Sequence, residues 1–498
     1  MIILNGNNCT LEQFIDVVRH HELVGLSDEG KEKVKLSRKY IDNVIETEKP
    51  VYGINTGFGK LSDVTINKCD TATLQKNLLM SHACGVGEPY SEEVVRGMML
   101  LRINALVKGY SGIRLETLEK LIEMLNKNVI PVVFEKGSLG ASGDLAPLSH
   151  MSLPLIGLGE VFYNGKRMSS INGLKEAGIE PLKTLEAKEG LCLINGTQSM
   201  TSVGALTLYD AYQLMDVSAI ALAMTMESLN AVIDAFDDRI HQLRGHSGQI
   251  KFARKIIRLL RDSKLISKQG ELRIQDAYSI RCAPQVSGAV TDTLDFVKRT
   301  IETEMNAVTD NPIVFSDSEE AISAGNFHGE PLAFALDYLG IALSEMANIS
   351  ERRIERMVNP ALSNGLPPFL VAKPGINSGF MIVQYSAASL VSENKVLSHP
   401  ASVDSIPSSA NQEDHVSMGS ISARKAAMIL DNVRKVISME LFSAAQAIDF
   451  RGKNKMSSST NKAYSVIRNH IPFIENDVIM YPYIHKVEEL IKTNQFNS

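Results

Sequence analysis

The chain has 498 residues, of which 44% are hydrophobic, so it can bury a large core, although length alone leaves the number of domains open. Its formal net charge is -6, and its Lys and Arg residues are mixed among Asp and Glu without forming a basic stripe. This pattern excludes nucleic acid and anionic membrane surfaces as expected partners.

The expected cellular location follows from the N-terminus and the cysteines. The opening MIILNGNNCT has no cationic lead and too few apolar residues for a secretion signal, and no stretch approaches an uninterrupted membrane span. Cysteines that are widely spaced, odd in number and without CxxC pairs are typical of reduced thiols. Here they are Cys9, Cys69, Cys84, Cys192 and Cys282. We therefore expect a cytoplasmic protein that does not enter a membrane.

The first unusual segment in chain order is EKGSLGASGDLAPLSH at 135–150, where Gly and Ala crowd around Ser142. Asp144 is a candidate N-cap, and Pro147 is tolerated in the first turn of a helix. The segment therefore predicts a helix that begins just after Ala141-Ser142-Gly143.

The next elements are a hairpin and a boundary. GEVFYNGKRM at 159–168 predicts a β-hairpin, because Asn164-Gly165 favours a two-residue turn between β-friendly flanks. The Pro/Gly-rich stretch at 172–190 is the candidate boundary between an N-terminal domain, 1–190, and a domain of long helices, 191–498.

Long helices dominate the rest of the prediction. The segment 199–235 is apolar on most faces, as expected for a helix surrounded by other helices. Three further segments, 290–305, 336–346 and 426–441, repeat apolar residues at steps of three and four. We expect a mainly α fold, a bundle of long helices with a smaller mixed N-terminal region. Apolar faces larger than one chain can cover also favour a homo-oligomer.

Ala141-Ser142-Gly143 is the candidate for unusual chemistry. Free amides and the macrodipole at a helix N-terminus favour negative charge placed there. Gly143 has no side chain to shield its amide nitrogen, which in a strained turn could approach the Ala141 carbonyl carbon. Cyclisation with dehydration of Ser142 would leave an exocyclic methylidene. On composition alone, an ordinary Gly/Ser turn is the commoner explanation.

Other catalytic motifs are missing from the sequence. Ser142 is not in a G-x-S-x-G elbow, and no S-x-x-K accompanies it. No HExxH, GKS or GKT occurs, and Gly57-Phe58-Gly59 lacks the third glycine of a dinucleotide loop. We expect no metal and no external cofactor.

A family resemblance favours the cyclised group over an ordinary turn at residues 141–143. GSLGASGDLAPLSH resembles the signature of the aromatic amino acid ammonia-lyases, in which Ala-Ser-Gly cyclises to a methylidene-imidazolone electrophile. No motif position departs from the family pattern, and the similar stretches run in family order from residue 52 to about 420. The others are YGINTGFGK (52–60), NLLMSHACGVGEP (77–89), INGTQ (194–198), QDAYSIRCAPQV (275–286), TDNP (309–312), GNFHGEP (325–331) and SSANQEDHVSMG (408–419).

The resemblance implies a fold of the fumarase/aspartase-like superfamily and 4-methylidene-imidazol-5-one formed from Ala141, Ser142 and Gly143. Capture of the substrate amine by the methylidene would make the amine a better leaving group. Tyr52 is then the base that takes a β-hydrogen. A phenol, with an ordinary pKa of about 10, can do so only where positive potential favours its anion, which this site could supply. Without the resemblance, Tyr52 is simply a packed turn tyrosine.

The resemblance also assigns binding roles. Arg281 is the candidate for the substrate carboxylate, with a surface ion pair as its ordinary alternative. Asn195, Gln275 and Tyr278 match positions that hydrogen-bond the imidazolone or the substrate, and we place Tyr278 in the catalytic set. The spacing of Gln275, Tyr278 and Arg281 puts one residue on each turn of a helix or tight loop. Phe327 matches an aromatic residue beside the electrophile, although a lone Phe is usually core. For Asp144, helix capping is a sufficient explanation.

Substrate choice is assigned to His82 and Glu413. A neutral imidazole offers one donor and one acceptor, so a histidine and a carboxylate could hold it from two sides. Unassisted, His82 would be taken as a satisfied structural histidine. Family members selective for tyrosine or phenylalanine carry His-Leu or Phe-Leu where this chain has Ser81-His82. That pair and NQEDH at 411–415 resemble the histidine-specific members.

The resemblance then implies elimination of ammonia from L-histidine to give trans-urocanate, the first step of histidine degradation. It also implies a homotetramer whose active sites draw residues from more than one subunit. Three alternatives stay open: a tyrosine or phenylalanine ammonia-lyase, an aminomutase that returns the amine to the β-carbon, and a non-catalytic helical scaffold. His82 and Glu413 argue against the first, and intact Ser142, Tyr52 and Arg281 argue against the third. Nothing in the sequence excludes the mutase, whose outcome depends on how long the product is held.

Overall fold

The computed structural model describes residues 1–47, 50–57, 59–61 and 63–496, and these residues divide into two compact units. Unit 1 comprises 1–206, 298–337 and 400–424, and unit 2 comprises 207–297, 338–399 and 425–498. The predicted boundary between residues 190 and 191 is a single cut, whereas each unit combines three separate segments. That boundary therefore stays a prediction.

Unit 1 contains short helices and all the strands found in the described residues. The helices are α1 (Leu11–Val18), α2 (Asp28–Thr47), α3 (Thr71–His82), α4 (Glu92–Leu106), α5 (Leu115–Asn126), α6 (Leu145–Ser152), α7 (Ser170–Glu176) and α8 (Glu189–Ile194). The strands are β1 (Ile2–Leu4), β2 (Val24–Leu26), β3 (Val86–Pro89), β4 (Ile130–Pro131), β5 (Phe134–Lys136), β6 (Glu160–Tyr163), β7 (Lys166–Ser169), β8 (Ile313–Phe315) and β9 (Glu320–Ile322).

The strands form four small sheets. The hairpin predicted at 159–168 is confirmed: β6 pairs antiparallel with β7, and Asn164 and Gly165 in the turn have φ of 49° and 73°. Positive φ at both central residues is what a type I′ turn requires. The parallel pair β1–β2 and the antiparallel pairs β3–β5, β4–β6 and β8–β9 were not predicted, because strands of two to four residues are too short to show alternation.

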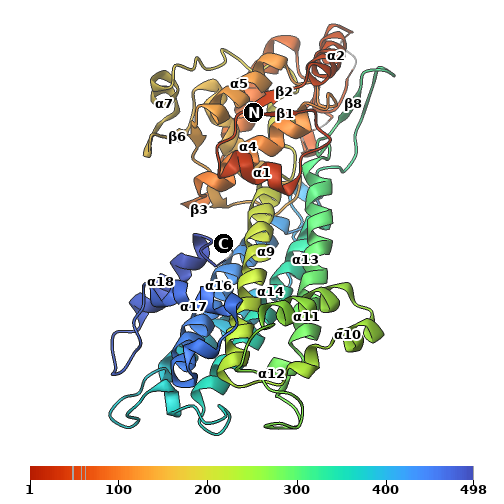
Figure 1. Ribbon diagram of the computed structural model, residues 1–498. Helices are drawn as coiled ribbons and strands as arrows, with labels where there is room; N and C mark the ends of the chain where they lie inside the picture. Colours follow the sequence, from red (N-terminus) through yellow and green to blue (C-terminus); the bar gives the residue numbers. More distant parts are fainter. Residues whose placement is uncertain (48–49, 58, 62, 497–498) are drawn as a thin grey trace. The chain divides into compact units, whose positions relative to one another are not determined.

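The predicted long helices are confirmed (Figure 1). Four helices contribute residues to both units: α9 (Gln198–Ser228), α13 (Ala283–Met305), α14 (Glu330–Val358) and α16 (Gly419–Arg451). Unit 2 adds α10 (Asp238–Arg244), α11 (Ser247–Leu259), α12 (Tyr278–Arg281), α15 (Met381–Leu397), α17 (Ser458–Arg468) and α18 (Tyr481–Lys492). The first long helix ends earlier than the predicted residue 235, because Asn230 adopts a left-handed conformation with φ of 48°.

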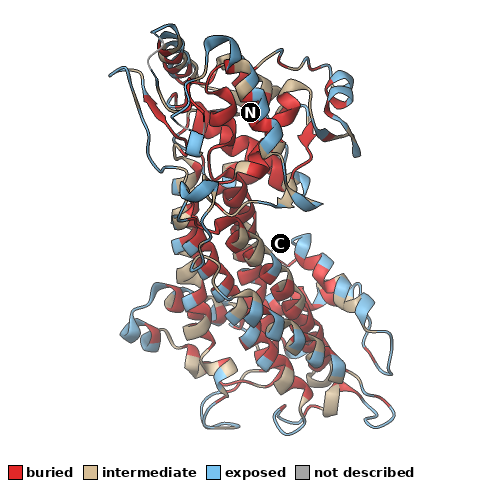
Figure 2. Cartoon of the chain, turned by 180° about the vertical axis from the view of Figure 1, so that it is seen from behind, coloured by how far each residue is buried: buried red, intermediate tan, exposed pale blue. Residues whose placement is uncertain are grey.

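Within unit 2 the long helices lie side by side, and their facing sides are buried (Figure 2). A buried carboxylate joins three of them. Glu440 on α16 accepts hydrogen bonds from Arg353 and Ser350 on α14 and from Thr225 on α9, at 2.6 to 2.9 Å. Because a buried charge is tolerated only when it is paired and hydrogen-bonded, this cluster fixes how the three helices pack.

One helix, α14, is long and apolar enough to cross a membrane by length and composition alone, a candidate that the sequence analysis missed. In its most apolar window, 67% of the residues are buried inside the protein. A helix at the centre of a bundle meets the same test, so this finding is weak support for a membrane span.

Candidate active site

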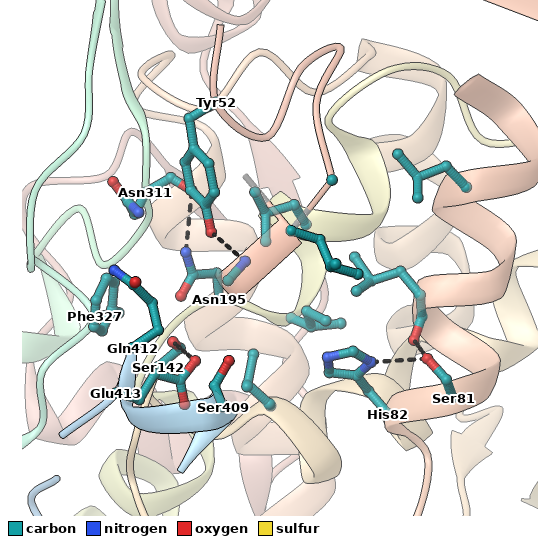
Figure 3. A pocket seen from close by; sticks show the side chains of 18 of the residues that line it. Tyr52, Ser81, His82, Ser142, Asn195, Asn311, Phe327, Ser409, Gln412 and Glu413 are labelled. Carbon is teal, nitrogen blue, oxygen red and sulfur yellow. Dashed lines mark hydrogen bonds between the residues drawn. The ribbon is translucent and has the colours of Figure 1, made fainter. Parts of the chain in front are cut away.

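Unit 1 contains a half-open cavity of about 870 Å3, lined by residues from distant parts of the chain. Of the residues predicted for the site, Tyr52, His82, Ser142, Asn195, Phe327 and Glu413 line it (Figure 3). Of the described residues that line it, none is a lysine or an arginine. The other residues that line the cavity are Gly57, Gly59, Leu61, Val64, Ile66, Leu74, Asn77, Leu78, Ser81, Leu145, Leu191, Ile194, Asn311, Ser323, Ala324, Ser409 and Gln412.

The turn that carries Ser142 is held in place by the turn after α8. Gly143 has φ of +71°, in the left-handed region, and bridges to Gly196 of the turn after α8. The Asp144 amide donates to the Gly196 carbonyl at 2.7 Å. A Cβ atom on Gly143 would lie 2.2 Å from the same oxygen. Glycine is therefore required here both by backbone conformation and by space.

The predicted helix after this turn is confirmed as α6, with Pro147 in its first turn, but the predicted role of Asp144 is wrong. The Asp144 side chain makes no capping bond to α6. Its Oδ2 accepts from the Met200 amide at 2.9 Å, in the first turn of α9, and its Oδ1 accepts from Ser420 Oγ at 2.6 Å, in α16. Burial raises the pKa of Asp144 to about 6, although these donors act in the opposite direction. Local sequence could not reveal a cap that belongs to a helix elsewhere in the chain.

Three helix N-termini meet around residues 138–145. α6 begins within this segment, and Asp144 reaches the first turns of α9 and α16. The start of α16 is tied in again by the Met418 amide, which donates to the Leu139 carbonyl at 3.0 Å. Helix N-termini present unpaired amides and a partial positive charge. The segment is therefore suited to hold negative charge that develops on its backbone.

We expect Gly143→Ala to destabilise unit 1 and to prevent any reaction of the turn. The new methyl group would meet the Gly196 oxygen, and the left-handed backbone would add strain of about 1–3 kcal/mol. Denaturant unfolding and turnover of L-histidine would measure the two effects.

Gly165→Ala is the matched control for this variant. Gly165 has φ of +73°, but nothing lies within 4 Å of a Cβ added there. Equal losses of stability in both variants, with full activity in Gly143→Ala, would contradict the role given to the close contact.

Ser142 points at the carboxylate predicted to bind substrate. Ser142 Oγ donates to Glu413 Oε1 at 3.1 Å, and Ser408 Oγ donates to Glu413 Oε2 at 3.2 Å. Backbone hydrogen bonds between Ser408 and Glu413, at 2.9 and 3.3 Å, hold the loop that carries the carboxylate. The electrophile candidate and the ring-binding candidate therefore lie in direct contact.

Tyr52 differs from the expectation in its electrostatics. Its hydroxyl accepts from the Gly59 amide at 3.4 Å. Burial, followed in the same direction by the negative charges of Glu413 and Asp310, raises the pKa of Tyr52, and the Gly59 bond lowers it only in part. Within unit 1 the surroundings of Tyr52 therefore disfavour its anion, whereas the sequence analysis expected a positive potential that favours it. A cation from outside the cavity wall would have to supply it.

His82, the last residue of α3, is neutral near pH 7. Burial lowers its pKa and outweighs both the acceptor carbonyl of Leu78 and the charge of Glu413, which raise it. Its Nδ1 lies 3.0 Å from Ser81 Oγ. The ring is held from one side and lines the cavity with the other (Figure 3).

Asn195 presents an open acceptor in the cavity wall. Its Nδ2 donates to the Asn311 carbonyl at 3.1 Å, while its Oδ1 is buried and receives no hydrogen bond from the part of the chain that the structure describes. Arg102, fully buried, donates to the Asn195 carbonyl at 3.1 Å and to Gln198 Oε1 at 2.9 Å, which fixes the turn. A buried amide oxygen left in this state favours a ligand that donates to it.

Gln275, Tyr278 and Arg281 belong to unit 2 and do not line the cavity. Tyr278 and Arg281 share the four-residue helix α12, and Gln275 precedes it. The Arg281 guanidinium carbon lies 4.4 Å from the centre of the Tyr278 ring, and Arg281 Nε donates to the Asp276 carbonyl at 2.9 Å. Tyr278 is 69% exposed. Two of the three residues that the spacing placed on successive turns therefore lie in contact, and the role of all three in the site stays a prediction.

Several lining residues had no predicted role although they lie in recognised motifs, and Asn311, Ser409 and Gln412 are among them. Asn311 belongs to TDNP, and Ser409 and Gln412 belong to SSANQEDHVSMG. Asn311 also accepts from Ser323 Oγ and the Ala324 amide, at 3.1 and 2.8 Å, so it joins Asn195 to the loop beside it. The sequence indicated these residues only through the motifs they belong to, because their residue types did not indicate that they would line the cavity.

One group of potential metal ligands occurs among the described residues: His328, Glu330 and His415 of unit 1, with ligand atoms within 4.8 Å of one another. His328 Nδ1 already accepts from the Glu330 amide at 3.3 Å. A metal-bound histidine normally donates through its second ring nitrogen. The expected absence of a metal stays a prediction.

The sequence model of the aromatic amino acid lyase family matches residues 9–469. The chain belongs to this family. A histidine ammonia-lyase of Alkaliphilus oremlandii is 58% identical over 490 residues, covering 98% of this chain and 96% of the relative. This membership confirms the predicted enzyme class, a carbon–nitrogen lyase.

Two solved structures of the lyase family share the fold. Histidine ammonia-lyase from Trypanosoma cruzi superposes with a TM-score of 0.92 at 42% identity, covering 99% of this chain and 94% of that one. Tyrosine aminomutase from Streptomyces globisporus superposes with a TM-score of 0.96 at 37% identity, covering 100% and 97%. The predicted mainly α fold class is confirmed.

Proposed function

We propose that this lyase removes ammonia and a β-hydrogen from L-histidine to give trans-urocanate. The observation that carries the proposal is that Ser142, the ring-binding candidates His82 and Glu413, and the base candidate Tyr52 line one cavity. The name of the A. oremlandii relative supports the same substrate. As the resemblance implies, this reaction would open histidine degradation.

We propose that Ala141, Ser142 and Gly143 form 4-methylidene-imidazol-5-one. Bond formation between the Gly143 nitrogen and the Ala141 carbonyl carbon releases one water, and dehydration of Ser142 releases a second. The left-handed conformation of Gly143 and its close backbone contact with Gly196 support a turn in which the backbone can cyclise. Once formed, the group supplies an electrophile for the substrate amine.

The chain's own residues have separate tasks in this proposal. The N-termini of α6, α9 and α16 stabilise negative charge on the turn. Tyr52 takes the β-proton through its hydroxyl oxygen, and the open Asn195 Oδ1 accepts a hydrogen bond from the reacting amine. Phe327 covers the reacting centre from the loop at 325–329 and excludes water.

The substrate carboxylate requires a cation, and no described residue of the cavity wall is a lysine or an arginine. We propose that Arg281 binds it, that Gln275 and Tyr278 accompany Arg281, and that all three come from neighbouring subunits of a homotetramer. The bidentate guanidinium fits a carboxylate and would also favour the Tyr52 anion.

A groove of about 740 Å3 in unit 2 supports self-association. It lies between α13 and α14, and Phe296, Tyr338 and Ile341 line it with 39%, 47% and 46% of their surfaces exposed. Clustered apolar exposure of this kind is typical of a subunit interface. Light scattering with an activity assay across a dilution series tests the proposal, and an active isolated monomer would contradict it.

We also propose a cytoplasmic location. The five cysteines are all free thiols, as in proteins of reducing compartments.

The function is tested by following absorbance in the urocanate band after mixing the purified protein with L-histidine. L-Tyrosine and L-phenylalanine run in parallel, and products are separated to detect β-amino acids. We expect turnover of L-histidine alone. Turnover of tyrosine or phenylalanine instead would overturn the roles of His82 and Glu413, a β-amino acid product would establish a mutase, and silence toward all three would favour a scaffold.

A further inference from the structure

The hydrogen bonds on one side of His82 determine where its ring proton lies. Ser81 Oγ donates to the Leu78 carbonyl at 3.2 Å and lies 3.0 Å from His82 Nδ1. A carbonyl oxygen can only accept, and a serine hydroxyl has a single proton. Because Ser81 gives that proton to Leu78, its oxygen can only accept from His82 Nδ1.

The charge of the His82 ring decides how many N–H groups it carries. The Leu78 backbone and the charge of Glu413 act to raise its pKa, and burial acts to lower it. The ring as a whole is neutral, since burial dominates its titration. A neutral imidazole has one N–H, so the proton is on Nδ1 and the Nε2 lone pair is an acceptor.

Nε2 is the nitrogen that meets the cavity. The ring edge opposite Ser81 is turned toward the middle of the cavity, where no labelled side chain lies against it (Figure 3). Glu413, the other ring-binding candidate, accepts hydrogen bonds from Ser142 and Ser408 through its two oxygens. Both groups assigned to the substrate ring therefore present acceptors.

We propose that Ser81 and the Leu78 carbonyl lock His82 in the Nδ1–H form, so that the site selects a substrate ring with an N–H aimed at His82 Nε2. This inference rests on the proposed function and deepens it. Ser81 is a positioning residue for specificity, since it acts on the substrate through His82. The ligand class is narrowed to α-amino acids whose five-membered ring carries an N–H donor.

Two analogues of histidine's size test the selection on the full chain. β-(Pyrrol-3-yl)-L-alanine has a ring N–H and no ring acceptor, whereas β-(thiazol-5-yl)-L-alanine has a nitrogen acceptor at the same ring position and no N–H. Their inhibition constants against L-histidine turnover are compared. We expect thiazolylalanine to bind at least about tenfold more weakly than pyrrolylalanine, because it leaves two acceptors facing each other. Equal or tighter binding of thiazolylalanine would overturn the proposal.

Ser81→Ala and Ser81→Thr separate positioning from a general structural effect. Alanine removes the hydroxyl oxygen, so we expect the ratio of the two inhibition constants to fall at least about threefold and the histidine KM to change more than kcat. Threonine keeps the hydroxyl and should keep the ratio. The same ratio in the wild type and Ser81→Ala would overturn the role of Ser81.

A readout without catalysis distinguishes this inference from the proposed function. Ring nitrogen-15 shifts of histidine-labelled protein, with His82→Gln for assignment, report which nitrogen carries the proton. We expect Nδ1–H in the wild type whether or not L-histidine is turned over. A proton on Nε2 would overturn the inference, while failure of histidine turnover alone would overturn only the proposed function.

Discussion

Replacing Ser142 with alanine is expected to reduce turnover of L-histidine by more than about a thousandfold, the scale of losing a covalent catalyst. Alanine has no hydroxyl to eliminate, so residues 141–143 cannot produce a methylidene. The fold should survive, because the variant lacks only the Ser142 hydroxyl and its hydrogen bond to Glu413, worth about 1 kcal/mol, and dehydration would remove the same hydroxyl from the wild type.

Two measurements establish this result. The urocanate assay gives the loss of activity, and mass spectrometry of the peptide that spans residues 138–145 should show a deficit of two water molecules only in the wild type. Ser152→Ala is the matched control, since Ser152 is a buried serine of α6 that donates to the Leu148 carbonyl, outside the cavity lining. Activity retained by Ser142→Ala would overturn the proposed electrophile.

Tyr52→Phe is expected to lower kcat by about a hundredfold to ten-thousandfold, the range for loss of a general base. Phenylalanine keeps the ring in the cavity and loses only the oxygen that accepts from Gly59. Because Tyr52 acts after the substrate binds, we expect KM for L-histidine to change little.

The comparison is with Tyr464→Phe, which removes a tyrosine hydroxyl from unit 2, where it donates to Asp449. We expect that variant to lose stability while keeping kcat. A Tyr52→Phe enzyme within twofold of the wild type would show that Tyr52 is not the base.

Helices were predictable where packing and local pattern agree. Apolar steps of three and four at 290–305, 336–346 and 426–441 recur in α13, α14 and α16 because those faces are buried in a bundle. Likewise, the φ values at Asn164 and Gly165 follow from two residues that tolerate positive φ. Asp144 shows where this reasoning ends: its residue type suits the start of α6, yet its carboxylate bonds to α9 and α16.

The candidate site was predictable as a set of residues but not as an assembly. Motif resemblance named Tyr52, His82 and Glu413, which the fold brings into one cavity. It could not indicate that burial and the Glu413 charge raise the pKa of Tyr52, because that effect depends on distances between remote segments. Nor could it indicate that Arg281 lies outside the cavity lining.

The contacts that hold the turn around Ser142 also determine when, during folding, Ser142 can react. Ser417 Oγ donates to the Gly140 carbonyl at 3.2 Å, and Ser420 Oγ donates to Asp144, so the turn is complete only after residues 417–420 have been synthesised and packed. A nascent chain still on the ribosome at residue 200 would have the reactive triplet without its support. Under the proposed function, loss of two waters is therefore a maturation step that follows folding. The fraction of the peptide that lacks two waters would then equal the fraction of molecules in which residues up to Ser420 have folded.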